Sequence, residues 1–166
     1  MIKKALALLA FAVACAMPIV AGAQPAADAG KMIGIFSQTV RTDGGNLQVI
    51  ILNDRTVEAV FGASPAKAAF RSKARMTTVF FVQGTAGKEF QFDPQLTVVQ
   101  KGETLQGKAT AMKNFTAGKI AKGDVIQGLV ELPKKLDLYE PFKLTLNGQT
   151  IDFRLNDDDV REFGNR

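Results

Sequence analysis

Ten short runs of apolar and β-branched residues, separated by turn residues, restrict the fold of this chain more than any other feature. The segments between them are rich in Gly, Asn and Asp, as in "TDGGN" (42–46). Short strands at this spacing are typical of antiparallel sandwiches and barrels, so we predict an all-β chain. The runs cover residues 32–40, 47–52, 56–61, 76–83, 89–92, 96–100, 104–112, 125–132, 142–146 and 149–155.

The segment "FKLTLNGQTIDFRL" (142–155) is the clearest single unit in the sequence. Asn147-Gly148 is a preferred dipeptide for a two-residue type I′ turn. Pairing across that turn gives one apolar face and one polar face, which is what a half-buried hairpin requires. The expected pairs are Leu146–Gln149, Leu144–Ile151, Phe142–Phe153, Lys143–Asp152 and Thr145–Thr150.

The run pattern and the hairpin together favour an immunoglobulin-like antiparallel β-sandwich of about eight or nine strands. A small closed β-barrel is the alternative. We expect short helices at 64–74, where Ser64 precedes Pro65, and at the C-terminus, where "NDDDVREF" (156–163) begins with capping residues. A single domain, 32–166, is expected to follow a short flexible leader at 24–31.

The first 23 residues have the pattern of a bacterial secretory signal peptide. Lys3 and Lys4 precede an apolar stretch, and Ala21-Gly22-Ala23 provides a small-residue cleavage site. Cys15 lies in "AVAC", which matches three of the four positions of a lipoprotein signal. We therefore expect a periplasmic or secreted protein cleaved after Ala23, without a transmembrane segment in the mature chain. The alternative is an envelope lipoprotein anchored through Cys15.

Missing residue types exclude several chemistries. The sequence contains no histidine, and Cys15 is its only cysteine. Cleavage after Ala23 therefore leaves no thiol or imidazole, which excludes disulfides, thiol nucleophiles, histidine-based triads and ordinary zinc sites. Tryptophan is absent and Tyr139 is the only tyrosine, which disfavours a sugar-stacking surface.

The charge of the chain indicates its possible partners. Loss of residues 1–23 leaves 19 basic and 16 acidic residues, a net charge of +3, too small to suggest a nucleic-acid partner. The charge is uneven, at +6 over 24–123 and −3 over 124–166. A lysine-rich stretch at 101–122 is a candidate basic strand and loop for an acidic partner. An anionic envelope surface or another envelope protein is the expected partner class.

Three weak motifs carry other chemistry. Ser64 and Lys67 match the S-x-x-K pair of penicillin-recognising enzymes, but the K-T-G motif is missing, so helix capping is the better explanation. The run Asp157-Asp158-Asp159 contains hard-cation ligands, yet its position also suits the start of a helix. An enzyme that hydrolyses glycans with two paired carboxylates is a third functional class for this chain. Its candidate acids are Glu58, Glu89, Glu131 and Asp152.

The sequence thus favours an exported, non-enzymatic protein that acts as a binding, accessory or assembly module. No catalytic, cofactor-binding or metal-binding residue is assigned, and no cofactor is expected. Because sandwich edges can bind an extended peptide by strand addition, a protein partner fits this class.

Overall fold

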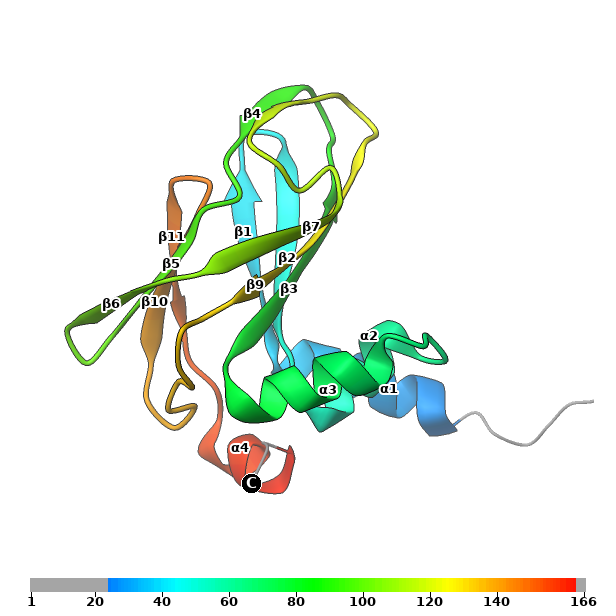
Figure 1. Cartoon of the computed structure of the whole chain (residues 1–166), viewed down its shortest axis with the longest axis vertical. Helices are drawn as coiled ribbons and strands as arrows, with labels where there is room; N and C mark the ends of the chain where they lie inside the picture. Colours follow the sequence, from blue (N-terminus) through cyan, green and yellow to red (C-terminus); the bar gives the residue numbers. More distant parts are fainter. Residues whose placement is uncertain (1–23, 164–166) are drawn as a thin grey trace, which may run out of the picture.

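The computed structural model describes residues 24–163 (Figure 1). Within this range, helices occupy both ends of the chain and one internal segment, and strands fill most of the remainder. The helices are α1 (Gln24–Ile35), α2 (Asp54–Phe61), α3 (Lys67–Met76) and α4 (Asp157–Phe163). The strands are β1 (Ser37–Thr42), β2 (Gly45–Ile51), β3 (Val79–Thr85), β4 (Phe90–Phe92), β5 (Leu96–Gln100), β6 (Glu103–Gln106), β7 (Lys108–Lys113), β8 (Gly118–Ile120), β9 (Val125–Glu131), β10 (Phe142–Leu146) and β11 (Gln149–Phe153).

The strands form three antiparallel sheets, which confirms that the chain is mostly β. The larger sheets have the orders β1-β2-β3-β9-β7 and β11-β10-β5-β6, and β4 pairs with β8 in a small ribbon. The chain passes from one large sheet to the other through the continuous segment β6–Gly107–β7 (Figure 1). β1 lies against β11 but forms no ladder with it, so the described strands do not close, and the alternative of a closed barrel is wrong.

The main core lies between the inner faces of the two large sheets. Val49, Phe80 and Val130 from the five-stranded sheet belong to the same buried cluster as Leu144 and Phe153 from the four-stranded sheet. All five side chains are fully buried, at 0% exposure. Burial of apolar surface on this scale is the main stabilising contribution in a chain without disulfides.

A second core lies on the outer face of the five-stranded sheet, under the helices. Ile50, Phe81 and Leu129 are on β2, β3 and β9 and pack against Val57 of α2 and Ala74 of α3. The helices cover only the end of the sheet that carries these apolar residues (Figure 1). The other end of the same outer face is left uncovered, and it carries the candidate site described below.

The predicted hairpin is confirmed in full. β10 and β11 pair in the expected register, from Phe142 opposite Phe153 to Leu146 opposite Gln149. Asn147 and Gly148 have φ values of 51° and 72°. Positive φ at both central positions is what a type I′ turn requires.

Two segments differ from their predicted structure. The expected strand at 56–61 is helix α2, because Asn53 accepts hydrogen bonds from the backbone N–H groups of Arg55 and Thr56 and forms a capping box with Thr56. Residues 24–31, expected to be a flexible leader, lie in helix α1, which extends to Ile35 and takes the start of the predicted strand at 32–40.

Two boundaries are also corrected. The helix expected at 64–74 covers Lys67–Met76, and its N-cap is Ala66 rather than Ser64. The run at 104–112 is divided at Gly107 into β6 and β7, which belong to different sheets. The C-terminal helix forms as expected, as α4.

The structure does not describe the segment with the predicted signal peptide, so residues 1–23 and Cys15 lie outside the described residues. Among residues 24–163, none of the helices has the length and apolar character that crossing a membrane requires.

Candidate functional site

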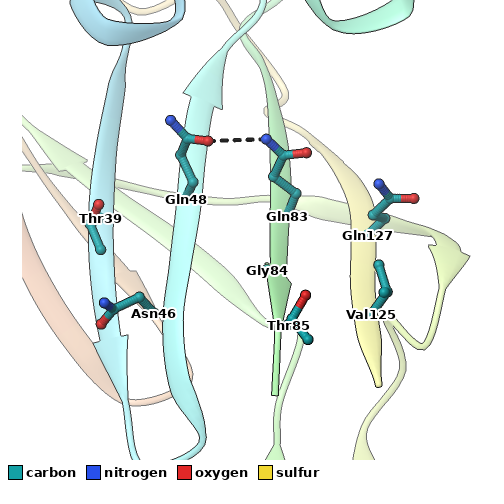
Figure 2. Close-up of a pocket in the computed structure, with 8 residues that line it drawn as sticks. All are labelled: Thr39, Asn46, Gln48, Gln83, Gly84, Thr85, Val125 and Gln127. Atoms are coloured by element: carbon teal, nitrogen blue, oxygen red, sulfur yellow. Dashed lines mark hydrogen bonds between the residues drawn. The ribbon is translucent and has the colours of Figure 1, made fainter. Parts of the chain in front are cut away.

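An uncharged polar hollow lies on the uncovered part of the five-stranded sheet (Figure 2). Strand pairing places Thr39, Gln48, Gln83 and Gln127 in one row, because each is the cross-strand partner of the next. These residues come from four neighbouring strands, and alternation along each strand points their side chains to the outer face. We call this site the amide hollow. Its lining residues are Thr39, Asn46, Gln48, Gln83, Gly84, Thr85, Val125 and Gln127.

Two of the three glutamines in the row, Gln48 and Gln83, are held by hydrogen bonds. Gln83 Nε2 donates to Gln48 Oε1 at 3.0 Å, and Gln48 Nε2 donates to Ser37 Oγ at 3.0 Å. Figure 2 shows the three glutamine side chains side by side on adjacent strands, with the Gln48–Gln83 bond between two of them. The side chains of these three glutamines are all half-buried. Each therefore packs against its neighbours on the sheet and still exposes part of its surface to solvent.

The hollow suits binding of a neutral polar group. Its volume is about 430 Å³, and none of the residues that line it carries a charge. A side-chain amide offers donors and an acceptor together, so it can pair with a group that has the same combination. Polar side chains in a shallow hollow can fix such a ligand by several hydrogen bonds, but they include no nucleophile activated by a base.

A second hollow, of about 530 Å³, lies between α1, α2 and α4. Its lining includes the carboxylate residues Asp28, Glu58 and Glu162. Glu58 is already paired: Lys67 Nζ lies 3.0 Å from its carboxylate, and Arg71 Nη2 lies 2.9 Å away. The hydrogen bond from Lys67 is the largest cause of the lowered pKa of Glu58. A general acid needs a raised pKa, so this carboxylate is poorly suited to be the general acid of a glycan hydrolase.

The other candidate acids are not brought together. Glu89 pairs with Lys119 at 2.9 Å, and Glu131 pairs with Lys73 at 2.6 Å. Asp152 lies on β11 opposite Lys143. The four carboxylates thus come from separate elements, and none of the other three lines the hollow that contains Glu58.

The serine–lysine pair and the aspartate run have structural roles. Ser64 Oγ accepts a hydrogen bond from the backbone N–H of Ala66 at 3.3 Å, while Lys67 is engaged by Glu58. Asp157, Asp158 and Asp159 form the first turn of α4, where negative charge complements the helix dipole. No group of three or more acidic side chains in the described range is placed to hold a metal ion.

The lysine-rich stretch at 101–122 is divided by the fold. Lys101 pairs with Asp137 at 3.0 Å and Glu140 at 3.6 Å, and Lys119 pairs with Glu89. Lys108 and Lys113 instead lie at the two ends of β7. The stretch therefore includes a basic strand, β7, as expected, whereas Lys101 and Lys119 are engaged in ion pairs.

Sequence reasoning did not identify the amide hollow. Its signal was a single glutamine inside each of three apolar runs, at Gln48, Gln83 and Gln127. Taken alone, each glutamine has the pattern of an ordinary strand residue whose side chain faces solvent. Their alignment depends on the order and register of strands that are far apart in the chain.

The chain matches no family model, and neither a curated protein nor a solved structure is similar to it.

Proposed function

We propose that this chain is an exported, non-enzymatic binding module of the cell envelope that docks a protein partner through the amide hollow. In this proposal residues 1–23 are the secretory signal peptide, and the two packed sheets are an immunoglobulin-like sandwich that serves as the scaffold. One observation carries the proposal: three glutamines from separate strands line an uncharged hollow on the part of the outer sheet face that the helices leave uncovered.

The chemistry of the hollow favours a peptide segment over the other ligand classes. The peptide unit carries one donor and one acceptor, which complements the glutamine amides. An anionic surface would need cations, and the lining residues have none. A sugar ring usually stacks on an aromatic side chain, and none lines the hollow. An uncharged, polar loop of an envelope protein is therefore the proposed occupant.

The non-enzymatic part of the proposal has separate support. The carboxylates available for acid–base chemistry are dispersed, and Glu58, Glu89 and Glu131 each lie within 3.0 Å of a lysine. The pKa of Glu58 is lowered, chiefly by the hydrogen bond from Lys67, which does not suit the protonated acid that a glycan hydrolase requires near neutral pH.

The test is affinity capture from envelope extract with paired variants. The Gln48→Leu/Gln83→Leu variant removes the hydrogen-bonded amides without changing the net charge. The matched control, Gln91→Leu/Gln106→Leu, adds the same apolar surface at exposed positions on β4 and β6. We expect the unmodified protein and the control to enrich the same partner, and the hollow variant to lose at least about tenfold of it, as expected for losing two good hydrogen bonds.

Three outcomes would contradict the proposal. Equal capture by the hollow variant would remove the amide hollow as the binding site. Capture of purified glycan instead of protein would change the ligand class. Mass measurement of the purified N-terminus tests export: Gln24 as the first residue agrees with the proposal, whereas a lipid-modified Cys15 would make the chain an anchored lipoprotein.

A further inference from the structure

Strand β7 is an edge strand that is exposed along its whole length. Among the strands of residues 24–163 it pairs only with β9, at the end of the five-stranded sheet. All six of its residues are exposed, including Ala109 and Ala111 on the face that β9 turns toward the core. An edge of this kind presents unpaired backbone groups that another strand can bind.

A bulge places both of the terminal lysines of β7 on the same face. In a regular strand, Lys108 and Lys113 would point to opposite faces, because their spacing is odd. The register shifts between Ala111 and Lys113, so Lys108 lies opposite Glu131 and Lys113 opposite Gln127. These two partners lie four positions apart on β9, an even spacing, so both lysines flank the same outer face.

The two lysines are not neutralised by the fold. Among the described residues neither forms an ion pair, since the carboxylate of Glu131 is bonded to Lys73 at 2.6 Å. Lys101 and Lys119, from the same stretch of sequence, are paired with carboxylates. Among the described residues, Lys108, Lys113 and Lys122 are therefore the lysines of this stretch without an ion pair, and two of these three lie at the ends of the open edge.

This charge arrangement decides which strand can bind. If two copies of the chain paired β7 with β7 in antiparallel orientation, in the register that pairs the whole strand, Lys108 of one copy would face Lys113 of the other. Like charges in directly opposite positions destabilise a sheet. A partner strand that carries carboxylates at the same two positions would be stabilised instead.

We propose that the edge of β7 is a second binding site, which accepts an extended acidic segment of a partner protein by antiparallel strand addition. The carboxylates of that segment are spaced i and i+4, as Gln127 and Glu131 are on β9, so that they face Lys113 and Lys108. This site goes beyond the proposed function, because it requires only β7 and its two lysines and not the amide hollow.

The experiment measures peptide binding by NMR on the purified, isotope-labelled protein. The probe is a short β-prone peptide with glutamates at i and i+4. Two comparison peptides have the same charge: one has glutamates at i and i+3, and one has alternate backbone amides N-methylated. We expect shift changes and new amide protection on β7 with the first peptide, and binding weaker by about fivefold or more with the other two.

Variants of the protein test the lysines directly. Lys108→Glu/Lys113→Glu should lose the acidic peptide and bind its lysine counterpart. Lys88→Glu/Lys122→Glu changes the net charge equally at exposed positions away from β7 and should bind as the unmodified protein does. Gln48→Leu/Gln83→Leu should also keep peptide binding, which separates this site from the amide hollow.

Equal binding of all three peptides would overturn the inference, because the edge would then bind anions in general, as a surface that attaches to an anionic membrane does. Loss of binding in the Lys88→Glu/Lys122→Glu variant would also overturn the inference, because binding would then depend on net charge rather than on the lysines of β7. Shift changes outside β7 and β9 would place the peptide elsewhere. Dimerisation of the unmodified protein through β7 would show that a second copy is the occupant.

Discussion

Two threonines near the helices have opposite hydrogen-bonding states. Thr56 Oγ1 accepts the N–H of Asn53 and donates to the carbonyl of Ile51, both at 2.8 Å, and the residue is fully buried. Thr77 Oγ1 is also buried, yet it has no hydrogen-bond partner within the described residues. A buried hydroxyl stabilises the fold only when its hydrogen bonds are made.

The same substitution should therefore have opposite effects at these two positions. Thr56→Val leaves a buried N–H and a buried carbonyl without partners and should lower the free energy of unfolding by about 2–3 kcal/mol. Thr77→Val removes an unpaired hydroxyl at a residue with extended backbone, φ −133° and ψ 172°, which suits valine. It should be neutral or stabilising by up to about 1 kcal/mol.

Urea unfolding of the two valine variants measures both effects. The m-value should stay unchanged, because the surface exposed on unfolding is the same. Thr104→Val, at an exposed position on β6, serves as the control and should change the free energy by less than about 0.5 kcal/mol. Equal destabilisation at Thr56 and Thr77 would show that hydrogen bonding does not explain the difference.

At the scale of elements, local sequence patterns were enough to predict some helices and strands but not others. The β10–β11 hairpin could be predicted because its turn dipeptide and its alternation agree, and both act within one short segment. Helix α2 could not be predicted from the β-branched residues in its apolar run. Its capping box, and the packing of Val57, Val60 and Phe61 on β2, β3 and β9, outweigh that propensity.

The contact between α2 and α3 should depend on pH through Glu58. Its pKa lies below the ordinary value of 4.5, chiefly because Lys67 donates a hydrogen bond to it and its charge adds to the effect. A carboxylate with a lowered folded-state pKa stabilises the fold above its unfolded pKa, and this stabilisation is lost as pH falls through the folded-state pKa. We therefore expect the Glu58–Lys67 interaction to be present at neutral pH and absent in acid.

A double-mutant cycle with Glu58→Gln and Lys67→Gln isolates this interaction. The coupling energy from urea unfolding should be favourable at neutral pH and fall toward zero as the pH drops below the ordinary carboxyl pKa of 4.5. It should also shrink in concentrated salt, because Glu58 is exposed and Lys67 is partly exposed. A coupling energy that is independent of pH would contradict an ionic interaction.

At the scale of the whole molecule, the candidate sites arise from strand order rather than from motifs. The glutamines of the amide hollow lie in runs that begin at residues 47, 76 and 125, and only the β2-β3-β9 order makes them neighbours. The sequence showed short strands and turns but, apart from the β10–β11 hairpin, not which strands pair. The edge position of β7 likewise depends on the passage of one continuous segment from the four-stranded to the five-stranded sheet.

Gly107 lies where this segment changes sheets. Its N–H donates to the carbonyl of Leu96 at 2.9 Å, which ties the crossing to β5. A Cβ atom at this position would overlap Val130 Cγ1, and its other close neighbour is Leu96 O at 3.2 Å. The absence of a side chain thus lets the segment pass directly over the inner face of β9, so that both sheets share one core.

A second double-mutant cycle tests this close approach. Gly107→Ala should lower the free energy of unfolding by about 1–3 kcal/mol through overpacking, and Val130→Ala should lower it by about 2 kcal/mol through lost burial. The double variant should be less destabilised than the two effects added together, by about 1 kcal/mol or more, because alanine at 130 makes room for the new methyl group. Pairing Gly107→Ala with Val49→Ala, on β2 and separated from β9 by β3, should give additive effects. Additivity in both cycles would mean that the crossing does not depend on contact with Val130.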